Sequence, residues 1–374
     1  MFYIKANDVK EVIESMAGAA KFCRDEDASI GVIAENGVVK FVLKNALVEV
    51  EKEVKAIVKK DFKFIASAHE MLLKIGVLPN DVEAVFGGIQ NGHVSIKWGR
   101  SNGLILFTEH ASKLEAVVVP EVEGDSITLD WGYYSRIFAH FCSSNDSEVA
   151  ATYPITKGVH FGSNAEGKLV VEASDAVRAI NQVVDGQWLS KGFSIPQEAM
   201  KAVNKLVKEA VTVGLVNDGS RLLIQAPNTK IITRIIDGEF VDTSKLYVDE
   251  NSPFVWKIDR LELLEVARRV KRLSGALGTI KFTHTNGKYL AIYENVLQQS
   301  LGVVCEGESS GFALSVVAIE SALTALKSDE VFICINAAGA PVTFLGSVTL
   351  EAESADAGTI EIENVKVMLG QVSK

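Results

Sequence analysis

The sequence lacks the features that mark membrane-spanning and secreted proteins. No segment approaches about 18 uninterrupted apolar residues, so no membrane-spanning helix is expected. The N-terminal segment Met1–Asp8 holds no basic region followed by an apolar run, which argues against a secretory signal. None of the cysteines forms a Cys-x-x-Cys pair, which favours free thiols; they are Cys23, Cys142, Cys305 and Cys334. We therefore expect a cytoplasmic protein that does not contact a membrane.

Motifs of catalysis and of cofactor binding are also missing. The sequence contains no His-Glu-x-x-His, no Gly-x-Ser-x-Gly and no Gly-x-Gly-x-x-Gly, and its histidines show no metal-ligand spacing. Gly162–Lys168 has the spacing of a phosphate-binding loop. However, Leu169 stands where a Ser or Thr should bind Mg²⁺, and a strand-like segment follows where a helix N-terminus is needed. A hairpin turn is the favoured interpretation, and we expect no enzyme activity, no metal and no cofactor.

Length and charge set the next limits. The chain has 374 residues, which favours two or three domains, and it is 48% hydrophobic and 23% charged, as in ordinary globular proteins. Its formal net charge of -10 argues against a protein coated with nucleic acid. Net charge says nothing about distribution, however, so a local basic surface stays open.

A weak internal repeat organises the chain. An apolar strand followed by an amphipathic helix occurs three times at intervals of about 125 residues, with strand markers Ile4, Leu129 and Trp256. Candidate helix N-caps follow them at Asn7, Asp130 and Asp259. A second helix begins half a unit later, after Phe64, Phe193 and Phe312. The segments between the helices are rich in β-branched and aromatic residues and are bounded by Asn-Gly turns, which predicts strands.

Each unit therefore holds two helices and roughly eight strands. We expect an α+β fold of three repeated domains, at residues 1–122, 123–250 and 251–374, each with two helices packed on mainly antiparallel sheet. Because the edges of such repeats match, neighbouring sheets can continue one another.

Five segments, in order, resemble those of the bacterial DNA polymerase III beta subunits, the DNA sliding clamps. They are Gly99–Thr108, Glu172–Ala179, Ile236–Asp242, Asp259–Ser274 and Ala322–Val331. The sequence departs from the family pattern in three places: Ala176-Val177 replaces Gly-His, Val241 replaces a proline, and Met368–Gln371 replaces Met-Pro-Met-Arg. The departures indicate a distant member, compatible with a phage-encoded or mobile-element-encoded clamp.

The resemblance implies a function and an assembly. Family members are head-to-tail homodimers that form a closed ring, encircle double-stranded DNA without reading its sequence and tether the DNA polymerase. The polymerase and the clamp loader bind through short linear peptides in an apolar cleft between domains two and three. The alternative is a three-domain α+β ligand-binding protein or enzyme with a cleft between repeats, which would need a convergent polar cluster.

The resemblance also implies which residues act. Helices that line the ring should carry basic residues despite the acidic total. In the helix expected after Asp259, the residues expected to face the sheet are Leu263, Ala267, Val270 and Leu273. The expected DNA-binding residues are Arg24, Lys74, Arg136, Lys201, Lys205, Lys208, Arg268, Lys271 and Arg272. The expected cleft residues are His160, Ser174, Val177, Arg178, Val241 and Met368. The alternative interpretations are solvated helix faces for the cations and plain core for the apolar cleft residues.

Overall fold

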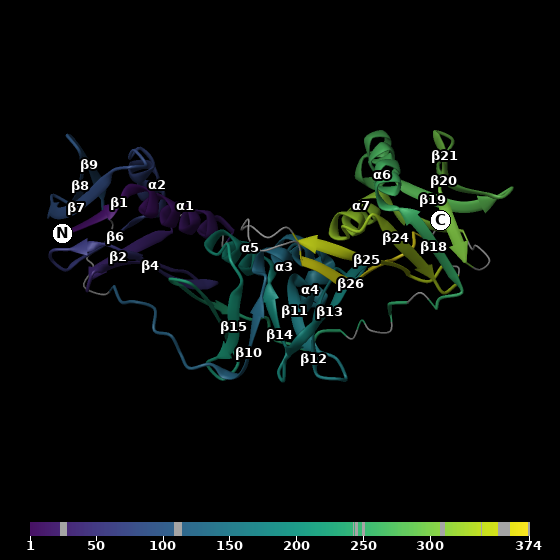
Figure 1. Cartoon of the computed structure of the whole chain (residues 1–374), viewed down its shortest axis with the longest axis horizontal. Coiled ribbons are helices and arrows are strands. Elements are labelled where there is room, and N and C mark those ends of the chain that lie inside the picture. The colour runs from purple at the N-terminus through teal and green to yellow at the C-terminus, as the bar shows by residue number, and fades with distance from the viewer. Residues whose placement is uncertain are drawn as a thin grey trace. The chain divides into compact units, whose positions relative to one another are not determined.

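A computed structural model describes residues 1–22, 28–107, 114–241, 243, 246–248, 251–306, 311–337, 339–350 and 360–372 (Figure 1). The chain divides into two compact units. Unit 1 comprises Met1–Arg136 and Trp188–Asp237, and unit 2 comprises Ile137–Gln187 and Gly238–Lys374. Each unit combines segments of two of the predicted domains, and the three-domain boundaries stay a prediction.

The larger sheet of unit 1 is antiparallel throughout. Its strand order is β10 (Glu123–Leu129), β15 (Val211–Val216), β16 (Arg221–Ala226), β17 (Thr229–Arg234), β4 (Val48–Lys55), β3 (Val38–Lys44), β2 (Ser29–Glu35) and β6 (Phe62–Ser67). The pairing of β17 with β4 joins strands that lie far apart in the sequence, with Ile231 opposite Val50. A smaller sheet has the order β5 (Ile57–Val58), β1 (Phe2–Lys5), β7 (Glu83–Gln90), β8 (His93–Trp98) and β9 (Ser101–Leu106).

The helices of unit 1 occupy the predicted segments. They are α1 (Ala6–Phe22), α2 (Ala68–Gly76), α3 (Trp131–Ile137, which reaches the unit boundary) and α5 (Gln197–Leu206, which follows strand β14, Phe193–Pro196). Ser67 caps α2 and accepts a hydrogen bond from the Glu70 amide at 3.1 Å, and the predicted cap Asp130 accepts one from the Tyr133 amide at 2.8 Å. Asn7 lies within the first turn of α1 and is not its cap. Helices α1 and α5 pack side by side.

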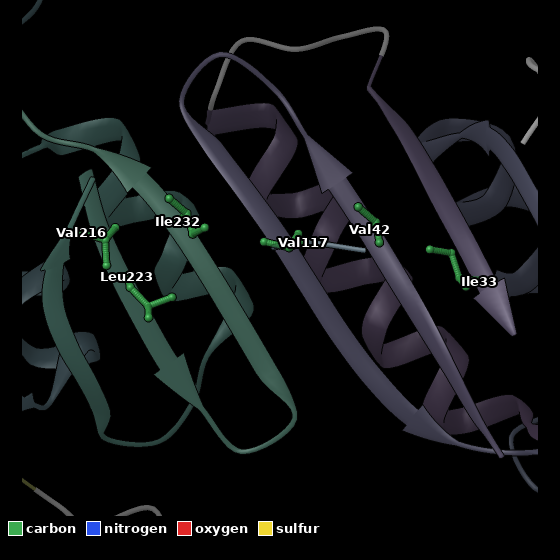
Figure 2. Close-up of a cluster of buried hydrophobic side chains, with 6 residues drawn as sticks. All are labelled: Ile33, Val42, Val117, Val216, Leu223 and Ile232. Atoms are coloured by element: carbon green, nitrogen blue, oxygen red, sulfur yellow. The ribbon is translucent and has the colours of Figure 1, made fainter. Parts of the chain in front are cut away.

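An extended strap, residues Leu114–Val122, crosses the larger sheet of unit 1. Within the strap, Val117 is buried in a cluster with side chains from both halves of the sheet: Ile33, Val42, Val216, Leu223 and Ile232 (Figure 2). The Val117 amide donates to Oε2 of the buried Glu51 at 2.8 Å. Glycines make room for both ends of the strap. A Cβ atom at Gly31 would lie 2.4 Å from Leu114 Cδ1, and one at Gly214 would lie 2.4 Å from Val122 Cγ1.

Unit 2 repeats the same architecture. Strands of its larger sheet follow the order β11 (Gly158–Ser163), β12 (Lys168–Ser174), β13 (Arg178–Trp188), β26 (Ile360–Leu369), β25 (Val342–Leu350), β24 (Glu330–Ile335), β18 (Phe254–Asp259) and β22 (Val303–Glu306). A four-stranded sheet has the order β21 (Leu297–Leu301), β20 (Lys288–Tyr293), β19 (Thr279–Thr285) and β23 (Phe312–Ser315). The helices are α4 (Glu148–Thr152), α6 (Arg260–Ser274) and α7 (Val316–Ala325), with 3₁₀ turns η2 (Phe138–Phe141), η3 (Pro154–Lys157) and η5 (Gly275–Leu277).

These elements confirm the predicted fold class, because each unit packs helices on antiparallel sheets. The phosphate-loop look-alike is the turn of the β11–β12 hairpin. In it the Asn164 amide donates to the Lys168 carbonyl at 3.0 Å, and the Lys168 amide donates to Asn164 Oδ1 at 2.9 Å. Asp259 caps α6 as predicted, accepting from the Glu262 amide at 2.7 Å. One expectation is wrong: Leu273 is 56% exposed and does not face the sheet. It lies in the last turn of α6, where the chain leaves the helix at Gly275. No helix in the described ranges is long and apolar enough to cross a membrane.

Candidate DNA-facing helices and peptide cleft

Helix α6 carries the highest concentration of positive charge among the candidate DNA-facing helices. Its apolar face is buried through Leu263, Leu264, Val266, Ala267 and Val270, so the charged residues occupy the remaining arc. One group of these charged residues faces strand β21. In it, Arg269 donates to Gln299 at 2.9 Å and to Glu265 at 2.8 Å. The three predicted DNA-binding residues of this helix lie on the other side, beside α7.

The side of α6 beside α7 forms a basic hollow, lined by Arg268, Lys271, Arg272 and Glu320. Glu320 of α7 accepts a hydrogen bond from Lys271 Nζ, and its Oε1 lies 3.9 Å from Arg268 Nε. The Arg268 and Lys271 side chains are about half exposed, whereas that of Glu320 is only 26% exposed. The structure therefore brings the three predicted cations together and adds a carboxylate that sequence reasoning missed.

A second basic group lies where α5 packs on α1 in unit 1. Lys205 Nζ sits 6.0 Å from the centre of the Phe22 ring, and Lys208 Nζ donates to Glu11 Oε1 at 2.8 Å. The three lysines predicted here, Lys201, Lys205 and Lys208, do not all lie on one helix. Lys201 and Lys205 belong to α5, but the helix ends at Leu206 because Val207 is extended, so Lys208 lies beyond it.

Sequence reasoning also missed Lys52, which lies beneath this group. Its Nζ donates to the Leu206 carbonyl at 2.9 Å and to Ser15 Oγ at 3.2 Å. Burial lowers the pKa of Lys52, and the hydrogen bond from Lys208 lowers the pKa of Glu11. Lys52 anchors the end of α5 to α1 and so supports the exposed lysines rather than joining them.

The remaining predicted cations are more scattered. Lys74 of α2 and Arg136 of α3 are exposed, while Arg24 lies outside the described residues. Basic residues outnumber acidic ones in α6 and α5, which have the composition expected of helices that line a ring. Helix α1 holds more acidic than basic residues, and the one charged residue of α7 is acidic.

The predicted peptide cleft centres on the β12–β13 turn, residues 174–178. Asp175 organises the turn: its Oδ1 accepts from the amides of Val177 at 3.0 Å and Arg178 at 2.6 Å. Ala176 takes a positive φ of 70°, a conformation that favours glycine, which is the family's residue at this point. Val177 is consequently held outward and is 59% exposed, so it is not core.

Arg178 points from this turn to α7. Its guanidinium donates to Asp175 Oδ2 through Nε at 2.8 Å and through one terminal nitrogen at 2.6 Å. Its other terminal nitrogen donates to Ser321 Oγ at 2.7 Å, and the group lies over the Phe141 ring. Arg178 is therefore mostly committed to contacts within unit 2, which fixes the turn against α7.

The other predicted cleft residues differ in exposure. His160 of β11 stacks on Phe240 with ring centres 4.8 Å apart, and burial lowers its pKa to about 4, so it is neutral at pH 7. Val241, the next residue after Phe240, is 54% exposed. Ser174 Oγ donates to the Arg178 carbonyl at 3.0 Å and is part of the turn. Met368 of β26 lies opposite Ala179 of β13 and is 5% exposed, so it is core in this structure.

Comparison with solved structures places this architecture among DNA polymerase III beta subunits. The beta chain from Streptococcus pneumoniae superimposes with a TM-score of 0.82 at 17% identity, covering 100% of this chain and 99% of that one. The Bacillus subtilis sliding clamp gives 0.80 at 17% identity, and the Thermotoga maritima beta subunit 0.79 at 16%, with the same coverage. The chain therefore has the fold of these subunits over its whole length.

Sequence comparison gives the same class. The chain is 23% identical to the beta sliding clamp of Staphylococcus epidermidis over 228 residues, and 24% identical to that of Staphylococcus aureus over 196 residues. These matches cover 57% and 49% of this chain, and 59% and 51% of those clamps. No family model matches the chain. The resemblance to beta sliding clamps expected from the five motifs is confirmed.

Proposed function

We propose that this chain is a DNA sliding clamp, a non-catalytic cytoplasmic ring that encircles duplex DNA and tethers a DNA polymerase. The observation that carries the proposal is the full-length match to beta subunits in fold, together with sequence similarity to beta sliding clamps. The alternative, a ligand-binding protein or enzyme with a cleft between repeats, draws no support from these relatives.

The charge distribution supports contact with DNA through α6 and α5. Net charge is -10 over the chain, yet α6 holds five basic and two acidic residues. Lysine and arginine side chains on helix faces bind phosphates without reading base edges, so the contact carries no sequence information. Such binding weakens steeply with salt, and a closed ring does not need it to be strong because the ring holds DNA topologically.

Two open sheet edges support a head-to-tail homodimer. Strand β9 ends the smaller sheet of unit 1, where Leu104 and Leu106 are 55% and 50% exposed. Strand β21 ends the four-stranded sheet of unit 2, and in the same unit Leu273 and Leu277 are also exposed. In the dimer, the exposed leucines of unit 1 in one copy would pack against the exposed leucines of unit 2 in the other copy. Because this contact is heterologous, it closes into a ring only at the right rotation per subunit.

A short linear peptide of the polymerase or the clamp loader would bind beside the β12–β13 turn. Val177 and Val241 offer exposed apolar side chains in unit 2, and the neutral His160 offers a polar group. Arg178 itself would contribute mainly by fixing the turn. Because Val177 and Val241 differ from the family pattern, we expect this cleft to prefer the peptides of its own polymerase.

Retention on DNA tests the proposed function. The protein would be loaded on nicked circular DNA by incubation or by a clamp loader, and separated from free protein by gel filtration in moderate salt. A clamp stays with circular DNA and is lost when one cut makes the DNA linear. Light scattering in parallel should give the mass of a dimer. A stable monomer that binds circular and linear DNA equally would refute the proposal.

A further inference from the structure

We propose that Glu320 competes with DNA phosphates for Lys271 and Arg268, and so keeps the contact of α6 with DNA weak enough for sliding. The inference rests on the proposed function and adds a positioning residue to it. Glu320 is the only charged residue of α7, whose other nine residues are apolar or hydroxyl-bearing. It points to α6, where it accepts the Lys271 hydrogen bond and lies 3.9 Å from Arg268 Nε.

The position of Glu320 is fixed by its helix. The amide of Val316, at the start of α7, donates to the Gly278 carbonyl at 2.9 Å. Ser321, the next residue after Glu320, accepts from the Arg178 guanidinium at 2.7 Å and donates to the Val317 carbonyl at 2.8 Å. The carboxylate is thus delivered by an anchored helix, whereas the lysine and arginine that it binds are long, half-exposed side chains.

The two cations can therefore exchange partners. A phosphate at the mouth of the hollow offers the same charge and the same acceptor oxygens as the Glu320 carboxylate. DNA binding at this point replaces one ion pair by another, so the gain is smaller than for a free lysine. Arg272 lines the same hollow and keeps a net attraction for DNA. Because Lys271 and Arg268 can return to Glu320, a bound phosphate can dissociate as readily as it binds.

Unit 1 shows the same arrangement independently. Lys208, beyond the end of α5, donates to Glu11 of the neighbouring helix α1 at 2.8 Å. In both units, therefore, a carboxylate on one helix binds a predicted DNA-binding lysine on a neighbouring element. Both side chains are more exposed here than in the α6–α7 pair, so we expect the effect in unit 1 to be smaller.

The test compares Glu320→Gln with Glu330→Gln as its matched control. Glu330 also binds a lysine, since its Oε2 lies 2.6 Å from Lys257 Nζ. This ion pair joins two strands of the larger sheet of unit 2 rather than two helices. Both variants remove one negative charge; Glu320→Gln removes the ion pairs with Lys271 and Arg268, and Glu330→Gln removes the one with Lys257. Binding of a short fluorescent duplex would be followed by anisotropy between about 50 and 200 mM salt.

We expect Glu320→Gln to tighten DNA binding about two- to fivefold at low salt relative to Glu330→Gln, with the gain shrinking as salt rises. On circular DNA the loaded ring should diffuse more slowly. In a Lys271→Gln, Arg268→Gln background the gain should vanish, which separates competition for these cations from a general charge effect. Circular dichroism at matched conditions confirms that each variant is folded.

Failure of this inference can be distinguished from failure of the proposed function. If wild-type protein is retained on circular DNA but Glu320→Gln binds no more tightly than Glu330→Gln, this inference is refuted and the clamp function stands. Retention of the gain in the Lys271→Gln, Arg268→Gln background would refute it equally. If wild-type protein is not retained on circular DNA, the proposed function itself fails, and this inference fails with it.

Discussion

Replacing Glu51 by alanine should release the strap from the larger sheet of unit 1. Glu51 is 2% exposed, and its Oε2 accepts from the Val117 amide at 2.8 Å while its Oε1 lies 3.4 Å from Lys230 Nζ. The substitution leaves a buried amide without its charged acceptor, which costs about 1 to 3 kcal/mol, and also removes an ion pair with the partly exposed Lys230. We expect unit 1 to lose about 2 to 4 kcal/mol in total.

Amide hydrogen exchange measures this loss locally, at Val117 itself. A loss of about 3 kcal/mol should speed exchange of the Val117 amide by roughly a hundredfold, while amides of unit 2 stay unchanged. Glu53→Ala is the matched control. It lies on the same strand, 3.7 Å from Lys230 and 30% exposed, so its replacement should cost less than about 1 kcal/mol. Equal effects of the two substitutions, or unchanged exchange at Val117 in Glu51→Ala, would refute the reasoning.

Four further predictions concern the pH response, the ring and the two sites. The folded pKa of His160 is about 4, below its unfolded value of about 6.5, so the stability from neutral His160 is complete above the unfolded value and is lost as pH falls from about 6.5 to 4. His160→Gln should flatten this part of the stability profile in urea titrations. Leu273→Asp should shift the light-scattering mass to a monomer, whereas Val118→Asp, at a still more exposed position on the strap, should not. Lys205→Gln should lower the salt slope of duplex binding by about one. Val177→Asp should weaken binding of a cognate polymerase peptide at least tenfold in anisotropy, with DNA binding unchanged; an unaltered peptide affinity would contradict the proposed cleft.

Local features were predictable because their causes are local. Helix starts at Ser67, Asp130 and Asp259 follow from side chains that bond amides three residues away. The hairpin at Gly162–Lys168 follows from the strand pattern on both sides of it. Helix ends were less predictable: Val207 turns extended and places Lys208 beyond α5, and only packing decides where the last turn stops.

The contacts that define the candidate sites are long-range and leave little trace in the sequence. Arg178 and Ser321 are separated by 143 residues, and Val117 and Glu51 by 66. Residue spacing cannot show that Glu320 would meet Lys271 across two helices. The signal that could have identified Glu320 is weak but real: a single carboxylate in an otherwise uncharged helix opposite a strongly basic one.

The pairing of β4 with β17 decides how this chain can be cut into fragments. A fragment that ends at residue 122 keeps β4 but loses β17, so it would present an unpaired strand edge and invite aggregation. The same fragment would keep the strap but lose Gly214, against which Val122 packs, and half of the buried apolar cluster around Val117. A polypeptide meant to stand for the first third of this protein should therefore include residues 188–237, joined by a short linker or expressed alongside it. Gene fusions and truncations designed on repeat boundaries alone would cut through a continuous sheet.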